Sequence, residues 1–417
     1  TTPTAIISVF IHFLIYPLFG HHVLYILCFV HIKCVTYIEI NSYIKLGDFM
    51  ITLSLCMIVK NEEEVLDRCL NSVKDFVDEI IIVDTGSSDT TKMVAQKYTD
   101  KIFDFEWCND FSKARNYAIQ FATGEYIMWL DADDVVPQKT INYLLSIKDN
   151  MCADVYMLKY DIAFWNNKPI FSYYRERIIK NCSLCKFVGA VHECIVPFGK
   201  VEKLDCCVQH HRITFIKNTR NLDIYQNIKK QRPLLPREQY YYARELFDHK
   251  KYSQSLCEFK KIVKNKNSWV ENVIDAYYLM SICYNIKNDK TKEFECLIKT
   301  FYYDTPRANI CCKIGDIFLE NSNYNIAIYW YKTATKCKCI IQKGGFVEDV
   351  YYNYYPYLQM CVCYYKLGDN KKAIYYNNKA GEYYKTDTIK QNKKLMQLCR
   401  KSISFSSKIL TSPRRIK

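Results

Sequence analysis

The sequence predicts an α/β domain followed by an all-α domain, and three observations support this fold class. From residue 50 onward, short apolar runs of strand length alternate with segments in which apolar residues recur at helical spacing. Pro233 and Pro236 then interrupt the chain within a cluster of basic residues. Beyond them the strand pattern ends, and similar helical segments recur at intervals typical of helix-turn-helix repeats.

The elements of the first domain follow one another as a βαβ unit and its continuation. Residues 53–59 (LSLCMIV) form an apolar run of buried-strand length, residues 62–76 place apolar side chains at helical spacing, and residues 79–84 (EIIIVD) give a second buried strand. The alternation continues with a helix at 90–98, a strand at 101–107, a helix at 111–122 and a strand at 125–130. This order predicts a doubly wound parallel sheet, whose ligands bind beyond the carboxyl ends of the strands, where Asp84 and Asp131 lie.

Composition and charge narrow the class of protein. The 417 residues are 49% apolar and 24% charged, enough to bury more than one ordinary core. The net charge is +14, but the lysines are scattered, so we expect a solvated surface and no nucleic-acid partner. The 21 cysteines show no regular disulfide framework, which favours a reducing compartment and a cytoplasmic location. The spacing of Cys182-x-x-Cys185 and the later cysteines and histidines matches no standard zinc module.

The first 49 residues differ from the rest of the chain. Residues 4–32 are apolar, but Pro17, Gly20 and two histidines interrupt them, so they make a weak membrane span. Met50 immediately precedes the first well-formed strand. We therefore expect residues 1–49 to be an extension outside the catalytic fold. A signal or membrane anchor is the alternative, and membrane association through these residues is not favoured.

Three carboxylates follow the strand predicted at 125–130. The stretch GEYIMWLDADDVV, residues 124–136, runs from apolar residues into Asp131, Asp133 and Asp134. Clustered carboxylates at a strand end suit Mg²⁺ or Mn²⁺, which commonly bridge protein carboxylates to a diphosphate. The alternative is a solvated turn in which an aspartate caps the next helix. Neither G-x-G-x-x-G nor G-x-x-x-x-G-K-[ST] occurs in this region, so the usual phosphate-binding loops are not available.

Four ordered motifs resemble one known family. They are SLCMIVKNEEEVLDRCLNSV, DEIIIVDTGSSDTT, DFSKARNYAIQFATGEYIMWLDADD and FVGAVHE, and together they lie within residues 52–215. The region is similar to the GT-A, family 2 glycosyltransferases. Their order, with helical repeats after the transferase domain, resembles the branch that includes the sublancin-type peptide S-glycosyltransferases. The resemblance implies a metal-dependent enzyme that transfers a sugar, with inversion, from a nucleotide-sugar donor such as a UDP-sugar to a peptide or saccharide acceptor.

The resemblance also implies roles for individual positions. The nucleotide-binding residues of the family correspond to Asn61, Glu62, Asp84, Asp89, Arg115, Asn116 and Asp131. Asp84 would face the base with Asp89 supporting its loop, and Asp131 would lie near the ribose. Asp133 would bind the Mn²⁺ or Mg²⁺ ion, and Asp134 would be a second ligand or a helix cap. Ordinary helix-surface polarity is the alternative for Arg115. Gly86, in the turn after Asp84, indicates positive φ or a close approach to a ligand, although a plain turn would also use glycine.

The region beyond Asp134 holds the expected acceptor side and the expected base. Residues 154–181 read as strands and a hairpin rich in aromatic residues, which are equally suited to a core. Glu193 of GAVHE is the acidic residue that the resemblance places as the base that takes the acceptor's proton. His192 is the alternative base, and pairing with Arg175 or Arg177 is the structural alternative for Glu193. Either His210 or His211 is a candidate for a further metal or phosphate contact.

The second domain reads as irregular tetratricopeptide-like repeats. Aligning its segments on Leu256, Glu293, Ile328 and Ile374 gives spacings close to the roughly 34 residues of such repeats, apart from an insertion around Gly344 and Gly345. We expect the transferase domain at 50–226, a linker at 227–238, repeats at 239–400 and a basic tail at 401–417. Repeat arrays present concave surfaces, which here suit a peptide acceptor, a protein partner or self-association.

Two other functions compete with an active transferase. One is a repeat-based interaction protein with an inactive glycosyltransferase domain, and the other is a nucleotidyltransferase of similar sheet topology. The aspartates, the Asp84 loop and the VHE motif are all intact, which favours the metal-dependent glycosyltransferase.

Overall fold

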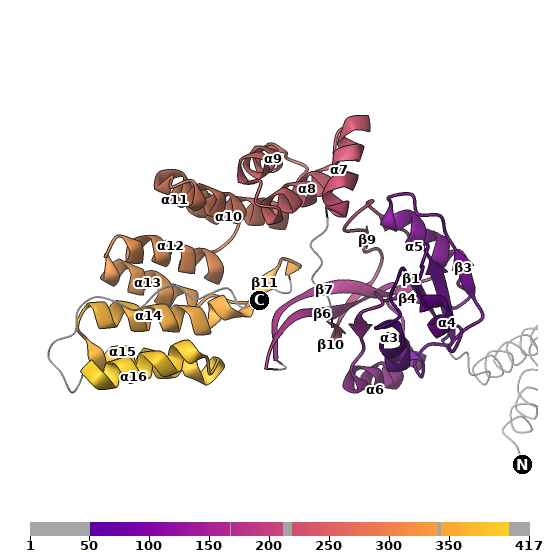
Figure 1. Ribbon diagram of the computed structural model, residues 1–417, viewed down its shortest axis with the longest axis horizontal. Helices are drawn as coiled ribbons and strands as arrows, with labels where there is room; N and C mark the ends of the chain where they lie inside the picture. Colours follow the sequence, from indigo (N-terminus) through magenta and orange to yellow (C-terminus); the bar gives the residue numbers. More distant parts are fainter. Residues whose placement is uncertain (1–50, 167, 212–218, 340–342, 400–417) are drawn as a thin grey trace, which may run out of the picture. The chain divides into compact units, whose positions relative to one another are not determined.

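The computed structural model describes residues 51–399 apart from 167, 212–218 and 340–342, so the predicted extension at 1–49 and the basic tail at 401–417 lie outside the described residues. Residues from Thr52 onward group into one compact unit, in which a β-rich part precedes a helical part (Figure 1). Among the described helices, none is long and apolar enough to cross a membrane.

A nine-stranded mixed sheet forms the centre of the β-rich part. Its main path runs in the order β3 (Ile102–Asp104), β2 (Glu79–Asp84), β1 (Leu53–Val59), β4 (Tyr126–Trp129), β7 (Lys168–Lys180), β6 (Val155–Trp165), β10 (Val201–His210) and β5 (Asp134–Val135). The first four strands are parallel, whereas β7 runs antiparallel to both β4 and β6. The parallel part expected from the alternating strands and helices up to residue 130 is present, and the hairpin expected within residues 154–181 is the antiparallel pair β6–β7, which makes the sheet mixed. The link between β6 and β7 is too short for a crossover helix, and only antiparallel strands can be joined by a tight hairpin.

Short helices connect the parallel strands. They are α3 (Leu66–Val73), α4 (Thr91–Ala95) and α5 (Phe111–Ile119), and α6 (Gln138–Ile147) follows β5. Each of the first three is shorter than the sequence predicted, since the residues at their ends form turns. The carboxylate of Asp110 caps α5 by accepting a hydrogen bond from the backbone N–H of Lys113 at 3.1 Å. This cap fixes where α5 begins.

The strands pack closely and are buried on both faces, as expected for a parallel sheet covered by helices. Leu53, Leu55 and Met57 of β1 are fully buried, and so is Ile82 of β2. Gly124 lies where β4 meets β1, and a Cβ atom there would stand 2.8 Å from the backbone nitrogen of Ser54. Only glycine permits this approach.

The register of the sheet places two strand ends at the same edge. Asp84, the last residue of β2, aligns with Val59, the last residue of β1. Trp129, the last residue of β4, aligns with Cys56 on the other side of β1. The segments that follow β2 and β4 therefore emerge beside each other, at the edge where ligands of such sheets bind.

Helices make up the second part of the chain. They are α7 (Arg220–Gln231), α8 (Pro236–Asp248), α9 (Tyr252–Lys264), α10 (Val270–Ile286), α11 (Lys290–Lys299), α12 (Ala308–Glu320), α13 (Tyr324–Ala334), α14 (Tyr354–Lys366), α15 (Asn370–Tyr383) and α16 (Asp387–Cys399). The four positions used to align the repeats fall on the second helix of successive pairs, in α9, α11, α13 and α15. The predicted helix-turn-helix repeats are therefore confirmed, and the sequence alignment placed equivalent helices at equivalent positions.

Two features separate or interrupt the repeats. The predicted linker at 227–238 contains the end of α7 and the start of α8, so only residues 232–235 lie between the two helices. Pro236 occupies the first turn of α8, where a backbone N–H would have no partner within the helix, so its absence costs nothing. The insertion predicted around Gly344 lies between α13 and α14. It carries β11 (Val347–Glu348), which pairs antiparallel with β7, and so adds a strand of the helical part to the sheet.

Candidate nucleotide and metal site

Asp84 offers an unused acceptor at the end of β2. The residue is 1% exposed, and its Oδ2 atom accepts hydrogen bonds from the backbone N–H groups of Gly86 and Ser87 at 3.1 and 3.0 Å. Gly86 has a φ of 98°, which confirms the positive φ considered for this turn. The Oδ1 atom of Asp84 is buried and has no hydrogen-bond partner among the described residues. An unpaired buried acceptor is costly, so this oxygen is suited to a ligand that donates a hydrogen bond.

Asn61, Glu62 and Asp89 hold the loop after β1 against the loop after β2. Asn61 has a φ of 54°, and its Oδ1 atom accepts the backbone N–H of Ser88 at 2.8 Å. The backbone N–H of Glu62 donates to Thr91 Oγ1 at 2.7 Å, and Asp89 Oδ1 accepts the backbone N–H of Thr91 at 3.0 Å. The structure thus brings these three predicted positions together around the Asp84 loop. Their contact with a nucleotide stays a prediction.

Arg115 joins two of the predicted site residues from within α5. It is 6% exposed; its Nη2 atom donates to Asp131 Oδ1 at 2.5 Å, and its Nε atom donates to Glu193 Oε1 at 2.6 Å. Burial alone would raise the pKa of Asp131, but the positive charges of Arg115 and Arg177 lower it to about 2. Arg115 is therefore a buried charge that holds two carboxylates in place. The alternative expectation, an ordinary polar side chain on the helix surface, is wrong for this residue.

Glu193 lies between β8 (Phe187–Val188) and β9 (Cys194–Ile195), which pair as a small separate sheet. Its carboxylate pairs with Arg115, whereas Arg175 donates from Nη2 to the backbone carbonyl of Glu193 at 3.0 Å. The structural alternative, a side-chain pair with Arg175 or Arg177, is thus replaced by a pair with Arg115. This pair orients the carboxylate, and its role as a base stays a prediction.

His192, the alternative base, is engaged by the helical part. It has a φ of 52°, its Nε2 atom lies 3.0 Å from Glu245 Oε1 of α8, and its ring stacks on Tyr241 with centroids 4.3 Å apart. Glu193 and His192 therefore face different surroundings, although they are neighbours in the sequence.

Asn116 does not present its side chain in the way predicted for a nucleotide contact. Its Nδ2 atom donates to the carbonyl of Phe187 at 2.9 Å, and its Oδ1 atom accepts the backbone N–H of Phe187 at 2.8 Å. The carboxamide thus extends β8 like a neighbouring peptide group. In this structure Asn116 positions the segment that carries Glu193.

Asp134 is a buried structural carboxylate. It is fully buried, as is Arg177, whose Nη1 atom lies 3.0 Å from Asp134 Oδ2, and the hydroxyl of Tyr160 donates to Asp134 Oδ1 at 2.8 Å. It does not cap the following helix, because α6 begins at Gln138 after Pro137. Both oxygens of Asp134 already have partners, and the helix-cap expectation is wrong; metal ligation by Asp133 stays a prediction.

Asp133 and His210 meet where β5 pairs with β10. One ligand atom each from Asp133, Asp134 and His210 lie within 4.8 Å of one another, and Asp133 Oδ1 is 3.3 Å from His210 Nδ1. Burial would lower the pKa of His210, but its hydrogen bonds to Asp133 and Asp134 raise it to about 10. Carboxylate oxygens with one imidazole nitrogen fit Mn²⁺ or Mg²⁺ chemistry, and a cation would take the place of the imidazole proton. Of the two candidate histidines, His211 instead stacks its ring on Phe164.

Sequence reasoning missed the aromatic centre of this site. The guanidinium groups of Arg115, Arg175 and Arg177 lie 4.7, 4.7 and 4.0 Å from the ring centroid of Trp129. Favourable cation–π contacts of this kind hold positive charge beside the carboxylates. Arg175 and Arg177 are two residues apart on β7, so their side chains share one face of the strand. This spacing is the sequence signal that could have indicated a cluster of arginines around Trp129.

Comparisons with known proteins agree with this geometry. Residues 54–201 match the family model described as Glycosyl transferase family 2. The chain is 28% identical over 248 residues to the SPbeta prophage-derived glycosyltransferase SunS of Bacillus subtilis, covering 55% of this chain and 58% of that protein. It is 54% identical over 89 residues to a TPR repeat-containing protein of Synechococcus elongatus, covering 21% of this chain and 22% of the relative.

A solved structure is also similar over part of its length. The structure of TarS residues 1–349 from S. aureus in complex with UDP has a TM-score of 0.34 and 16% identity, and covers 60% of this chain and 91% of that one. The chain spans 22% and 58% of the lengths of the two curated relatives named above. Together, the family match, the mixed sheet and the paired helices show that this chain carries a family 2 glycosyltransferase domain of GT-A fold followed by tetratricopeptide-like helical repeats.

Proposed function

We propose that this protein transfers a sugar, with inversion, from a nucleotide-sugar donor to an acceptor, with a divalent cation bound at Asp133 and His210. The proposal depends mainly on one observation: two groups suited to bind a ligand lie at the same edge of the sheet. They are the unpaired Oδ1 atom of Asp84 at the end of β2, and the group formed by Asp133, which follows β4, with His210 at the end of β10.

The nucleotide would lie along the ends of β2, β1 and β4. Asp84 Oδ1 would accept the N–H of the base, and a pyrimidine such as uracil presents one such group on its pairing edge. The resemblance to family 2 implies a uridine diphosphate. Asp131 would lie near the ribose, held by its ion pair with Arg115. The loop of Asn61, Glu62 and Asp89 would keep the Asp84 turn in place.

The cation would stand between the aspartates and the diphosphate. When bound, it supplies positive charge that stabilises the leaving diphosphate. Asp133 is 22% exposed at its side chain, so it can reach a ligand, while the fully buried Asp134 is compensated by Arg177 and Tyr160. Asp134 would thus shape the metal loop from behind.

Glu193 is the proposed base. In an inverting transfer, the acceptor nucleophile attacks the anomeric carbon from the face opposite the leaving diphosphate, and a carboxylate takes the nucleophile's proton. The ion pair with Arg115 orients the Glu193 carboxylate. Because Arg115 also holds Asp131, one side chain would couple the donor side of the site to the acceptor side.

Nucleotide release tests the proposal. Purified protein is incubated with a panel of UDP- and GDP-sugars, with either Mn²⁺ or EDTA, and free UDP or GDP is measured over time. Release with Mn²⁺ that exceeds the EDTA reaction supports the transferase. If no donor binds and no nucleotide is released with any cation, the domain is inactive and the protein acts through its repeats.

A further inference from the structure

The proposed base lies on a short segment with little structure of its own. Residues 187–195, called here the Glu193 segment, comprise β8, β9 and the turn between them, which form a two-stranded sheet separate from the nine-stranded one. Gly189 and His192 in the turn have positive φ values of 98° and 52°. The left-handed region is unfavourable for histidine, and an isolated pair of strands is marginally stable in water. The conformation that presents Glu193 therefore depends on contacts with other elements.

The transferase domain holds the two ends of the turn. The backbone carbonyl of Ala190 accepts from the backbone N–H of Phe111, the first residue of α5, at 2.9 Å. The backbone carbonyl of Glu193 accepts from Nη2 of Arg175 in β7 at 3.0 Å. The two carbonyls between them face other donors.

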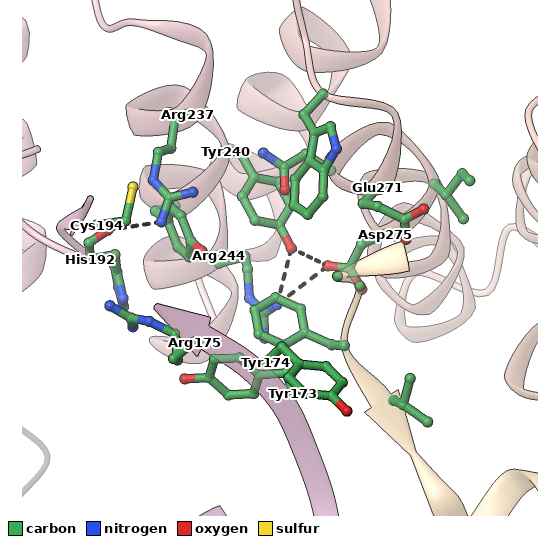
Figure 2. A pocket seen from close by; sticks show the side chains of 18 of the residues that line it. Tyr173, Tyr174, Arg175, His192, Cys194, Arg237, Tyr240, Arg244, Glu271 and Asp275 are labelled. Carbon is green, nitrogen blue, oxygen red and sulfur yellow. Dashed lines mark hydrogen bonds and ion pairs between the residues drawn. The ribbon is translucent and has the colours of Figure 1, made fainter. Parts of the chain in front are cut away.

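The first two helices of the helical part hold the middle of the turn. The hydroxyl of the fully buried Tyr225 in α7 donates to the carbonyl of Val191 at 3.0 Å. Burial raises the pKa of Tyr225 well above its ordinary value, so the hydroxyl keeps its proton and remains a donor. Arg237 of α8 donates from Nη2 to the carbonyl of His192 at 3.1 Å, and Figure 2 shows this arginine beside His192 and Cys194. Four consecutive carbonyls, from residue 190 to residue 193, are thus held by four different elements.

Helix α8 also binds the side chain of His192. The Nε2 atom of His192 lies 3.0 Å from Glu245 Oε1, which accepts from Asn221 Nδ2 at 3.0 Å as well. Burial would raise the pKa of Glu245, but the hydrogen bonds from His192 and Asn221 lower it, so the carboxylate is the acceptor and His192 Nε2 the donor. The imidazole stacks on Tyr241 with centroids 4.3 Å apart. Both the main chain and the side chain of the residue before Glu193 are therefore fixed by α8.

The turn is packed against the same helices. Val191 is 4% exposed and lies in one apolar cluster with Leu222 of α7, Leu246 of α8 and Phe111 of α5. A displacement of α7 or α8 would expose Val191 to water and leave its carbonyl without a partner. The position of the turn is thus tied to the position of the two helices.

We propose that Tyr225, Arg237 and Glu245 are positioning residues, which hold the turn before Glu193 in the conformation that proton transfer requires. The inference rests on the proposed transferase function and deepens it, since it makes α7 and α8 part of the catalytic unit. Their loss should lower the rate and spare the affinity for UDP, because the proposed nucleotide and metal residues follow β1, β2 and β4.

Hydrolysis of the donor tests the proposal without an identified acceptor. The oxygen of water bonds to the anomeric carbon, its proton passes to Glu193, and UDP leaves with the bonding electron pair. The full-length protein is incubated with Mn²⁺ and the UDP-sugar that the wild type hydrolyses fastest, and kcat and KM are measured. Calorimetric titration gives the affinity for UDP on the same preparations.

Three variants remove or restore single contacts of the turn. Tyr225→Phe removes one hydroxyl; Tyr225 does not line the cavity of about 690 Å³ that His192 and Glu245 line between the sheet and the repeats, so this change leaves the cavity wall intact. Glu245→Ala removes the acceptor of His192, and Glu245→Gln keeps an oxygen that can accept from the imidazole.

Two further variants are matched controls. Tyr126→Phe removes another buried hydroxyl that donates to a backbone carbonyl, that of Ala153 at 2.9 Å. Glu293→Ala removes another buried carboxylate of the helical part that accepts from an asparagine, Asn285, at 2.9 and 3.0 Å. Neither side chain contacts the Glu193 segment through these bonds.

We expect Tyr225→Phe and Glu245→Ala to lower kcat at least about tenfold, within the roughly hundredfold that a small displacement of a reacting group can cost. KM and the affinity for UDP should stay within about threefold of the wild type. Glu245→Gln should restore kcat to within about threefold, and both controls should stay within about twofold.

A double-mutant cycle separates positioning from a general loss of stability. If Tyr225 acts through Glu193, adding Tyr225→Phe to Glu193→Gln should lower kcat by no more than about a further twofold, because no carboxylate remains to be positioned. Additive losses in the double variant would overturn the proposal. So would kcat values of Tyr225→Phe and Glu245→Ala within about twofold of the wild type, or equal losses in the controls.

Hydrogen exchange followed by mass spectrometry reports on the segment without any activity. Peptides that cover residues 187–195 should exchange faster in Tyr225→Phe and Glu245→Ala, whereas those of β1 and β2 should not change. Unchanged exchange in the Glu193 segment would refute the hold by α7 and α8. If the wild type releases no nucleotide, the transferase proposal fails, while faster exchange still supports that hold. Hydrolysis by the wild type and equally by the variants refutes positioning and leaves the transferase proposal standing.

Discussion

The substitution Asp84→Asn tests whether this carboxylate reads the base of the donor. The change replaces one carboxylate oxygen with an NH₂ group and keeps the size of the side chain. Its orientation is decided by the structure, because the backbone N–H groups of Gly86 and Ser87 point at Oδ2 from 3.1 and 3.0 Å. The remaining oxygen must stay there, so the NH₂ group takes the place of the unpaired Oδ1 atom.

The expected loss follows from that orientation. A base N–H that donated to Oδ1 would then face two hydrogen atoms of the new amide. A hydrogen bond to a charged group contributes about 1.5–3 kcal/mol, and about 1.4 kcal/mol corresponds to a tenfold change in affinity. UDP should therefore bind the variant about 10- to 100-fold more weakly, and the thermal transition should move by no more than a few degrees.

The assay is calorimetric titration of UDP, with Mn²⁺ present, into wild type, Asp84→Asn and Asp104→Asn. Asp104 ends the adjacent strand β3 and aligns with Asp84 in register. Lys92 Nζ lies 3.8 Å from Asp84 Oδ2 and also pairs with Asp104, whose side chain is 77% exposed. It therefore controls for the loss of one negative charge near the same lysine. A UDP affinity of Asp84→Asn within twofold of the wild type, or an equal loss in Asp104→Asn, would refute the assignment.

Three further predictions concern the metal, the base and the buried support. Asp133→Ala should abolish Mn²⁺-dependent nucleotide release while the melting temperature stays within a few degrees, because this partly exposed carboxylate adds little to packing; release that persists would remove it from the metal shell. Glu193→Gln should bind donor normally but transfer sugar at least about a hundredfold more slowly, as measured by single-turnover kinetics, and normal transfer would leave Glu193 a purely structural role. Arg177→Met should lower the free energy of unfolding in urea by about 3–5 kcal/mol, since it removes the buried ion-pair partner of Asp134; a loss under about 1 kcal/mol would show that Tyr160 and His210 suffice to stabilise this carboxylate.

The sequence alone was enough to predict the elements whose pattern is local. Buried strands read as apolar runs at 53–59 and 79–84, and both appear with these bounds as β1 and β2. The positions of the repeats could also be predicted, because each repeat packs against its neighbour in the same way. Leu256, Glu293 and Ile328 therefore all fall on the second helix of successive pairs. The aspartates at the strand ends could also be predicted from the local sequence, because a carboxylate that directly follows an apolar run is visible without knowledge of its partners.

Only the tertiary structure decided which of these residues meet. His210 reaches Asp133 because β10 pairs with β5 across more than seventy residues of sequence, and Arg115 joins Asp131 to Glu193 because α5 packs beside both. Asn116 lies one residue farther along the same helix, yet it faces β8 instead, since successive helical residues point about 100° apart. The insertion between two repeats pairs with the transferase sheet and lines part of the cavity between that sheet and helices α8, α10 and α12. Such contacts depend on strand pairing and helix packing between distant segments, which local periodicity does not encode.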